Sequence, residues 1–233
     1  MFVRVILLEP EVPGNVGSIA RSMRNFGLHD LSIVNPKTTL NGDARAFAMH
    51  GLPILESARI APTLRQAIED VDVVVGTSSI IAKSPSNLSR IAITPRQLAE
   101  RTRKQRGVLG LVLGRESSGL SNQELDECDF MVTIPASKEY NVLNLATAAS
   151  IIFYELFHEQ ASGGPELASQ AAKKRLLAQS EHLTVLSGLQ AHRRKLAQRA
   201  FRNVVSRSMI SRREASLLIG LFRKACGKLG KLK

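Results

Sequence analysis

Three short groups of polar residues and glycines have the types and spacing of ligand-binding loops. In the first group, Asn15 lies six residues before Arg21, where a loop leads into an expected helix. A guanidinium at such a junction can reach a phosphate or a ribose hydroxyl, and Gly17 allows a close backbone approach. The alternative is an ordinary surface arginine in a helix that Asn15 caps.

The second group, Gly114-Arg115-Glu116-x-x-Gly119, follows a strongly apolar run. A strand that ends in glycine, with another glycine nearby, can present backbone amides to a ligand, and Arg115 and Glu116 either pair or bind. The Gly-Lys-Ser/Thr of a phosphate loop is missing, and so is a Gly-x-Gly-x-x-Gly after the first strand, so a dinucleotide site is not indicated. A turn without a ligand stays an alternative.

The third group runs from Ile134 to Asn144, between an apolar strand and a long apolar helix. Asn144 could simply cap that helix, and Tyr140 could simply pack. Because ligands of open α/β sheets bind at the carboxyl ends of strands, we place a cofactor at loops 114–120 and 135–144.

The elements that position these loops are expected strands, seen as apolar runs, which alternate along the chain with segments of helical periodicity. Such alternation predicts an α/β fold, with a mostly parallel sheet and helices on both faces. The strands are expected at 3–8, 31–34, 71–75, 108–113 and 130–134, and the main helices at 16–26, 43–50, 63–70, 95–104 and 143–156, with a short helix opening at 121.

The composition changes after a Ser-Gly-Gly-Pro segment. We therefore predict a first domain over 1–161, a linker over 162–165 and a basic helical extension over 166–233. Within the extension the patterns predict helices at 166–187, 189–206 and 211–227.

Charge divides along the same boundary. Residues 165–233 carry sixteen Lys and Arg against three acids, a net charge of +13, whereas 1–164 carry −1. This asymmetry indicates a polyanion partner, although a solvated basic face is the alternative. The leading candidates for phosphate contacts crowd onto one expected helix: Arg193, Arg194, Lys195, Arg199 and Arg202.

Several classes of protein do not fit the sequence. No run of some 18 apolar residues occurs, so no membrane span is expected. Cys128 and Cys226 are too few for a disulfide framework or a zinc site, which favours reduced thiols in a cytoplasmic protein. The patterns of a Ser-His-Asp triad, paired catalytic carboxylates and a metal site are missing, so no metal is expected.

In order and spacing, the three groups resemble the motifs of the SPOUT superfamily of RNA methyltransferases, in its TrmH branch. Motifs 1, 2 and 3 of that branch match EPEVPGNVGSIARSMRNFGLHDLSIVNP, GLVLGRESSGLSNQEL and IPASKEYNVLNLATAASIIFYEL. Within the branch, the TrmJ type of tRNA 2′-O-ribose methyltransferase is the most similar, and the likeness includes GTSS at 76–79 and a basic helical tail. The resemblance covers 1–160 and, more loosely, 190–227.

The resemblance implies that the domain ends in a deep trefoil knot and that S-adenosylmethionine is the cofactor. The family usually has Ser where this chain has Val142, so any hydroxyl role at that position is absent or moved. The residues that the resemblance assigns to the cofactor pocket are Thr77, Ser78, Ser79, Gly114, Ile134, Asn141, Val142 and Leu143.

It further implies methyl transfer to a ribose 2′-hydroxyl of tRNA, at nucleotide 32 of the anticodon loop, by a homodimer. Arg21, Asn15 and Glu116 are the expected catalytic residues, with Arg21 beside the partner's pocket. Because a guanidinium is fully protonated, we expect Arg21 to stabilise the developing alkoxide or a nearby phosphate rather than to act as the base. RNA contacts are expected from Arg21, Arg115, Tyr140, Asn144 and the five cations of the tail.

Three alternatives remain open at this point. The target could be rRNA or another position of tRNA, and the protein could bind RNA without catalysis. The third alternative is a Rossmann-type nucleotide enzyme. Such an enzyme would bind NAD and not S-adenosylhomocysteine. The helix at 143–156, apolar on nearly all its faces, favours a dimer, because one domain core rarely needs so much apolar surface.

Overall fold

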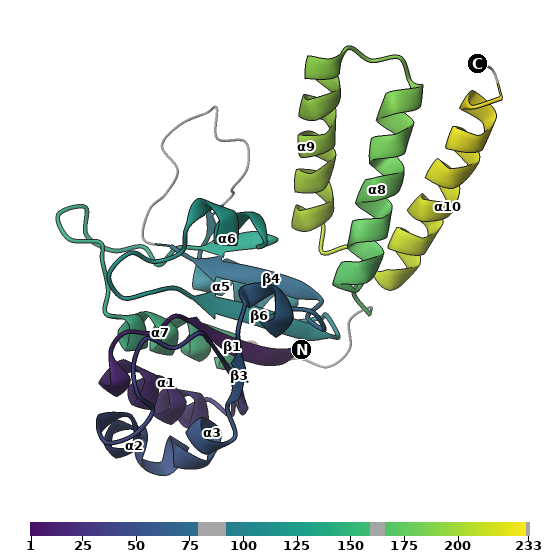
Figure 1. Ribbon diagram of the computed structural model, residues 1–233. Helices are drawn as coiled ribbons and strands as arrows, with labels where there is room; N and C mark the ends of the chain where they lie inside the picture. The colour runs from purple at the N-terminus through teal and green to yellow at the C-terminus, as the bar shows by residue number, and fades with distance from the viewer. Residues whose placement is uncertain (79–91, 159–165, 232–233) are drawn as a thin grey trace.

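The computed structural model describes residues 1–78, 92–158 and 166–231 (Figure 1). Its centre is a seven-stranded sheet in the order β3-β2-β1-β6-β4-β7-β5, and every strand pair in it is parallel. This confirms the predicted α/β class. The strands are β1 (Phe2–Leu8), β2 (Asp30–Val34), β3 (Arg59–Ala61), β4 (Val73–Thr77), β5 (Ala92–Ile93), β6 (Val108–Leu113) and β7 (Phe130–Val132).

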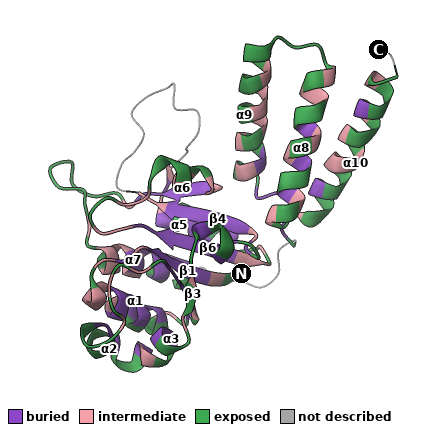
Figure 2. Ribbon diagram, in the orientation of Figure 1, coloured by how far each residue is buried: buried purple, intermediate pink, exposed green. Residues whose placement is uncertain are grey.

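Both faces of the sheet are covered by helices. Its central strands therefore consist of consecutive apolar residues and do not alternate between apolar and polar ones. Along β1, Val5 and Leu7 belong to one core and Ile6 to the other, and all three are fully buried. Figure 2 shows the central strands of the sheet coloured as buried. The first core is closed by α1 (Pro13–Asn25), α5 (Pro95–Thr102) and α7 (Leu145–His158). The second is closed by α4 (Leu64–Ala67) and by side chains beside α6 (Asn122–Asp126).

A layer of short helices packs outside α1: α2 (Asp43–Ala48), η1 (Met49–Gly51) and α3 (Leu52–Glu56). Gly17 makes this contact possible, because a Cβ there would lie 2.1 Å from the carbonyl oxygen of Ala44. The close approach expected at Gly17 is therefore an approach to α2.

The strand order brings the polar loops together. β7 inserts between β4 and β5 and pairs with both, so the carboxyl ends of β4, β6 and β7 meet at one edge of the sheet. Residues 114–120 and 135–144 follow β6 and β7 at that edge. The knot implied by the resemblance stays a prediction.

The C-terminal helices are α8 (Gln170–Leu186), α9 (Ala191–Arg207) and α10 (Arg212–Leu229), close to their predicted bounds. In Figure 1 they stand beside the sheet, with α8 between its two neighbours. They share a core of their own, which includes Leu176, Val205 and Ala215. The predicted linker at 162–165 lies outside the described residues, and the domain division stays a prediction.

A buried ion pair fixes α8 to the amino-terminal edge of the sheet. The Lys173 ammonium donates to Asp129 Oδ2 at 3.1 Å and to the backbone oxygen of Asp72 at 2.8 Å, and both charged side chains are buried. The amide of Gln170 also donates to Asp129 Oδ2, at 3.0 Å. The tail is thus joined to the sheet by specific contacts, at the edge opposite the polar loops. No helix within the described part of the chain is long and apolar enough to cross a membrane.

Candidate functional site

A cavity of about 910 Å³ lies at the carboxyl ends of β4, β6 and β7. All three polar groups of the sequence contribute to its lining, and apolar side chains such as Leu120, Met131 and Ile152 line it as well. Ser79 lies outside the described residues. The other predicted cofactor residues all line this cavity: Thr77, Ser78, Gly114, Ile134, Asn141, Val142 and Leu143.

The sheet fixes the inner wall of the cavity. The Thr77 hydroxyl donates to the backbone oxygen of Val112 at 3.1 Å, and the backbone N–H of Ser78 donates to that of Val132 at 3.0 Å. These bonds connect the end of β4 to both of its neighbours. This wall is therefore set by the backbone and needs no ligand to form.

Loop 114–119 closes on itself. Arg115 and Gly119 exchange two backbone hydrogen bonds, of 3.2 and 2.9 Å, and Gly119 has a φ of +67°, which favours glycine. A Cβ on Gly114 would lie 2.4 Å from the carbonyl carbon of Gly119. Both glycines are thus explained by the shape of the loop that lines the cavity.

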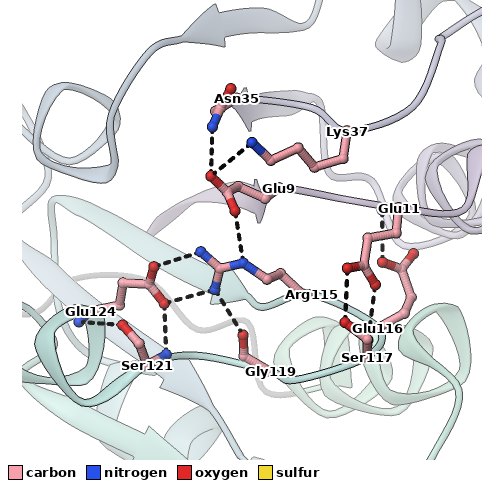
Figure 3. A network of polar contacts seen from close by, with 10 residues as sticks. All are labelled: Glu9, Glu11, Asn35, Lys37, Arg115, Glu116, Ser117, Gly119, Ser121 and Glu124. Carbon is pink, nitrogen blue, oxygen red and sulfur yellow. Dashed lines mark hydrogen bonds and ion pairs between the residues drawn. The ribbon is translucent and has the colours of Figure 1, made fainter.

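Arg115 is the centre of an ion-pair network beneath this loop (Figure 3). Its Nε donates to Glu9 at 2.8 Å, and its two terminal nitrogens donate to Glu124 at 2.8 and 3.1 Å. Nη1 also donates to the backbone oxygen of Gly119 at 3.2 Å. Arg115 therefore connects the end of β1, the loop after β6 and the start of α6.

The network extends to the end of β2 and changes the pKa values of its charged members. Glu9 accepts from Asn35 at 2.5 Å, and both residues have positive φ, of 46° and 44°. Hydrogen bonding to Arg115 lowers the pKa of Glu9 and of Glu124, while these two carboxylates raise the pKa of Arg115. The guanidinium pairs with these glutamates and not with Glu116. Its RNA contact stays a prediction, although the structure already uses all three nitrogens.

Side-chain hydrogen bonds join one residue from each polar group. The Glu116 carboxylate accepts from the Asn15 amide at 3.0 Å and from the backbone N–H groups of Glu11 and Val12 at 2.9 and 3.3 Å. The Asn15 oxygen in turn accepts from the Asn144 amide at 2.9 Å. Residues more than 100 positions apart thus meet at the rim of the cavity.

This chain of bonds corrects one local expectation and confirms another. Asn15 is not the helix cap, because α1 begins at Pro13 with Val12 at its N-cap position. Asn144 does cap α7, since its side-chain oxygen accepts from the backbone N–H groups of Ala146 and Thr147 at 2.9 and 3.2 Å. The same side chain also connects α7 to α1, because its amide nitrogen donates a hydrogen bond to Asn15.

Arg21 lies apart from these residues. It is exposed on α1, does not line the cavity, and has no hydrogen-bond or ion-pair partner within the described residues. Tyr140 and Val142 line the cavity with side chains that are 77% and 51% exposed. One chain therefore supplies the cavity and its rim without placing Arg21 there.

The cations predicted on α9 divide into two sets. Lys195, Arg199 and Arg202 line a second cleft, of about 860 Å³, between α6 and the helices α8 and α9. Arg193 and Arg194 do not line it.

Glu9 and Glu124 are the site residues that the sequence analysis missed. Ser121 and Glu124 have the spacing of a capping box, and the structure has that box, but the spacing does not show that Glu124 also binds Arg115. Glu9 gave a weaker signal, as a carboxylate directly after a buried strand.

A parallel α/β sheet with a cavity at the carboxyl ends of its strands is the arrangement of a cofactor-binding enzyme. The model of the SpoU rRNA Methylase family matches residues 2–154, which include the sheet and all three polar groups. The chain belongs to this family.

Two relatives show which members of the family the chain is similar to. The tRNA (cytidine-2′-O-)-methyltransferase TrmJ of Methanocaldococcus jannaschii is 36% identical over 96% of this chain and 99% of its own length. The tRNA (cytidine/uridine/adenosine-2′-O-)-methyltransferase TrmJ of Pseudomonas aeruginosa is 40% identical over 66% of this chain and 60% of its own.

Solved structures agree with the sequence comparison. The crystal structure of TrmJ from Z. mobilis ZM4 covers 96% of this chain and 99% of its own, with a TM-score of 0.73 and 26% identity. The SpoU methyltransferase AviRb from Streptomyces viridochromogenes, in complex with the cofactor AdoMet, covers 70% of this chain and 59% of its own, with a TM-score of 0.54 and 25% identity. The resemblance drawn from the three motifs is therefore confirmed.

Proposed function

We propose that the protein transfers a methyl group from S-adenosylmethionine to a ribose 2′-hydroxyl of tRNA, at nucleotide 32 of the anticodon loop. The observation that supports this proposal most directly is the pair of side-chain hydrogen bonds that connects Glu116, Asn15 and Asn144. These bonds join the three polar groups at the rim of one cavity. The TrmJ relatives, whose names describe tRNA 2′-O-methylation, support the substrate. Nucleotide 32 follows from the resemblance to the TrmJ type.

The cavity suits the cofactor in size and chemistry. Its volume of about 910 Å³ lies within the range of small-molecule sites, and apolar and polar residues both line it. Thr77, Ser78, Gly114, Ile134, Asn141, Val142 and Leu143 would hold S-adenosylmethionine. The bound cofactor supplies an activated methyl group on its sulfonium. We expect much of the contact with the cofactor to be through backbone groups, so a valine at position 142 is compatible with binding.

The chain itself has to align the ribose and favour its nucleophilic form. Asn15, Asn144 and Glu116 form a fixed polar rim from which amide groups can orient the ribose. Arg21 stabilises the alkoxide that develops at the 2′-oxygen, or a neighbouring phosphate that accepts its proton, because a guanidinium keeps its own proton at neutral pH. When bound, S-adenosylmethionine would supply the methyl group, and the rim of Asn15, Asn144 and Glu116 would hold the 2′-oxygen in position to accept it.

The position of Arg21 supports a homodimer. Since Arg21 lies outside the cavity of its own chain, we propose that it acts at the partner's cavity. An aromatic cluster beside α1 is available for such an interface. The rings of Tyr154 and Phe157 lie 6.2 and 6.0 Å from that of Phe26, and both side chains are about half exposed.

We further propose that 1–161 is the methyltransferase domain, 162–165 a linker and 166–233 the RNA-binding extension of a cytoplasmic enzyme. The net charge of the extension supports this division. An rRNA target is the second candidate, because the family that matches the chain is described as one of rRNA methylases.

Transfer from radiolabelled S-adenosylmethionine to purified tRNA and to rRNA tests the proposal. We expect label in tRNA, carried by an alkali-stable dinucleotide, which marks a 2′-O-methyl group. Label in rRNA alone would support the second candidate. Calorimetry with S-adenosylhomocysteine tests the cofactor separately, and failure to bind it would refute the methyltransferase proposal.

A further inference from the structure

Helix α6 borders two hollows, the cofactor cavity and a second cleft. Leu125, near the C-terminal end of α6, lines both the cofactor cavity and the second cleft of about 860 Å³. In Figure 1, α6 lies between α9 and the loop at 135–144. A chain molecule that lies in the cleft therefore has to cross only one short helix to enter the cavity.

One wall of the cleft carries a row of unpaired cations. Lys195, Arg199 and Arg202 are four and then three residues apart, so they lie on one face of α9. All three are exposed, and among the described residues none has an ion-pair or side-chain hydrogen-bond partner. Lys174 of α8 and Arg207 at the end of α9 also line the cleft.

Two of the four acids that line the cleft are paired with cations outside the row on α9. Glu127 pairs with Arg65 at 2.8 Å, and Asp129 pairs with the buried Lys173 at 3.1 Å. Asp126 and Glu181 are the remaining acids of the lining, against five cations outside these two pairs. The cleft therefore keeps an excess of positive charge, concentrated on α9.

The two walls are held at a fixed separation. Asp129, three residues beyond the end of α6, anchors α8 through Lys173 and Gln170, and α8 packs along α9. The cleft thus exists before a ligand arrives, which lowers the entropic cost of binding.

We propose that this cleft binds the sugar–phosphate backbone of the RNA substrate, and that the strand crosses α6 to place its target ribose in the cofactor cavity. A row of long, flexible cations suits repeated phosphates, which position a nucleic acid without reading its sequence. The inference rests on the proposed function for the identity of the RNA.

The test compares two triple variants of the full-length protein. Lys195→Gln/Arg199→Gln/Arg202→Gln removes the cations of the cleft. Its control, Arg213→Gln/Arg223→Gln/Lys224→Gln, removes the same charge from exposed positions on α10 that do not line the cleft. Fluorescence anisotropy measures the affinity for tRNA over a salt series, and calorimetry measures the affinity for S-adenosylhomocysteine.

We expect the cleft variant to lower the slope of log affinity against log salt by about 2–3, at roughly 0.7–0.9 per phosphate contact. Relative to 1 M salt, the same loss at 0.15 M salt amounts to roughly 50- to 150-fold in affinity. The control should keep most of the slope, and both variants should bind S-adenosylhomocysteine as the parent does. Equal losses in the two variants, or none in the cleft variant, would overturn the proposal.

A conservative variant separates RNA binding from folding. Arg199→Lys/Arg202→Lys keeps the charge and should retain the salt slope. If the cations instead hold α9 against the acids of α6, the cleft variant will lose thermal stability while its RNA affinity matches that of the control, and the proposal fails. These readouts do not depend on methyl transfer, so a failed proposed function would appear separately, as absent S-adenosylhomocysteine binding in the parent.

Discussion

Replacing Arg115 with alanine should destabilise the protein far more than the loss of an ordinary surface arginine. The guanidinium donates to Glu9, Glu124 and the backbone oxygen of Gly119, and its side chain is only 20% exposed, with 21% and 19% for the two glutamates. Exposed pairs contribute about 0–1 kcal/mol, whereas breaking a buried pair costs about 3–5 kcal/mol. For this partly buried network we expect a loss of about 2–3 kcal/mol in the free energy of unfolding.

Urea denaturation measures this loss, and Arg45→Ala is the matched control. Arg45 pairs with Glu56 at 2.6 Å, but the two side chains are 47% and 49% exposed. We expect the control to lose less than about 1 kcal/mol. Equal losses in the two variants would refute the structural role assigned to Arg115.

The same variant should change the dependence of stability on pH. Arg115 lowers the pKa of Glu9 and Glu124 in the folded state below the ordinary value of 4.5. Their contribution is therefore complete above about pH 5 and is lost as the pH falls through the lowered pKa values. The difference in stability between the parent and Arg115→Ala should shrink between pH 5 and pH 3. A constant difference would contradict the assigned cause.

Two further predictions follow from the site. Arg21→Ala should lose nearly all methyl transfer yet bind S-adenosylhomocysteine as the parent does, because Arg21 lies outside the cavity; full turnover in the variant would remove its assigned role. Asn144→Ala should lower the free energy of unfolding by about 1–2 kcal/mol, because it removes the cap of α7 and the bond to Asn15, and an unchanged stability would contradict that role.

Local patterns were enough to predict the long elements. The apolar run at 108–113 became β6 with the same bounds, and the helix expected at 143–156 became α7 at Leu145–His158. β3, β5 and α3 were missed, since segments of two to five residues carry too little periodicity. β3 exists because Ile60 pairs with Ile33 of β2, which no local pattern indicates.

The site was predictable as a place but not as a set of contacts. Strand ends and glycines located the loops, and the resemblance predicted their ligand. The bonds from Asn15 to Glu116 and Asn144 join residues 101 and 129 positions apart, and sequence spacing cannot show which atoms meet. For the same reason, the choice of Arg115 between pairing and ligand binding needed the position of Glu9, 106 residues away.

The most direct test of the proposed activity uses tRNA transcripts that differ by one oxygen. One transcript carries ribose throughout, a second has 2′-deoxyribose at nucleotide 32 only, and a third has it at a neighbouring loop nucleotide. With labelled S-adenosylmethionine, we predict transfer to the first and third transcripts and none to the second. Equal transfer to all three would contradict methylation of the 2′-hydroxyl at nucleotide 32.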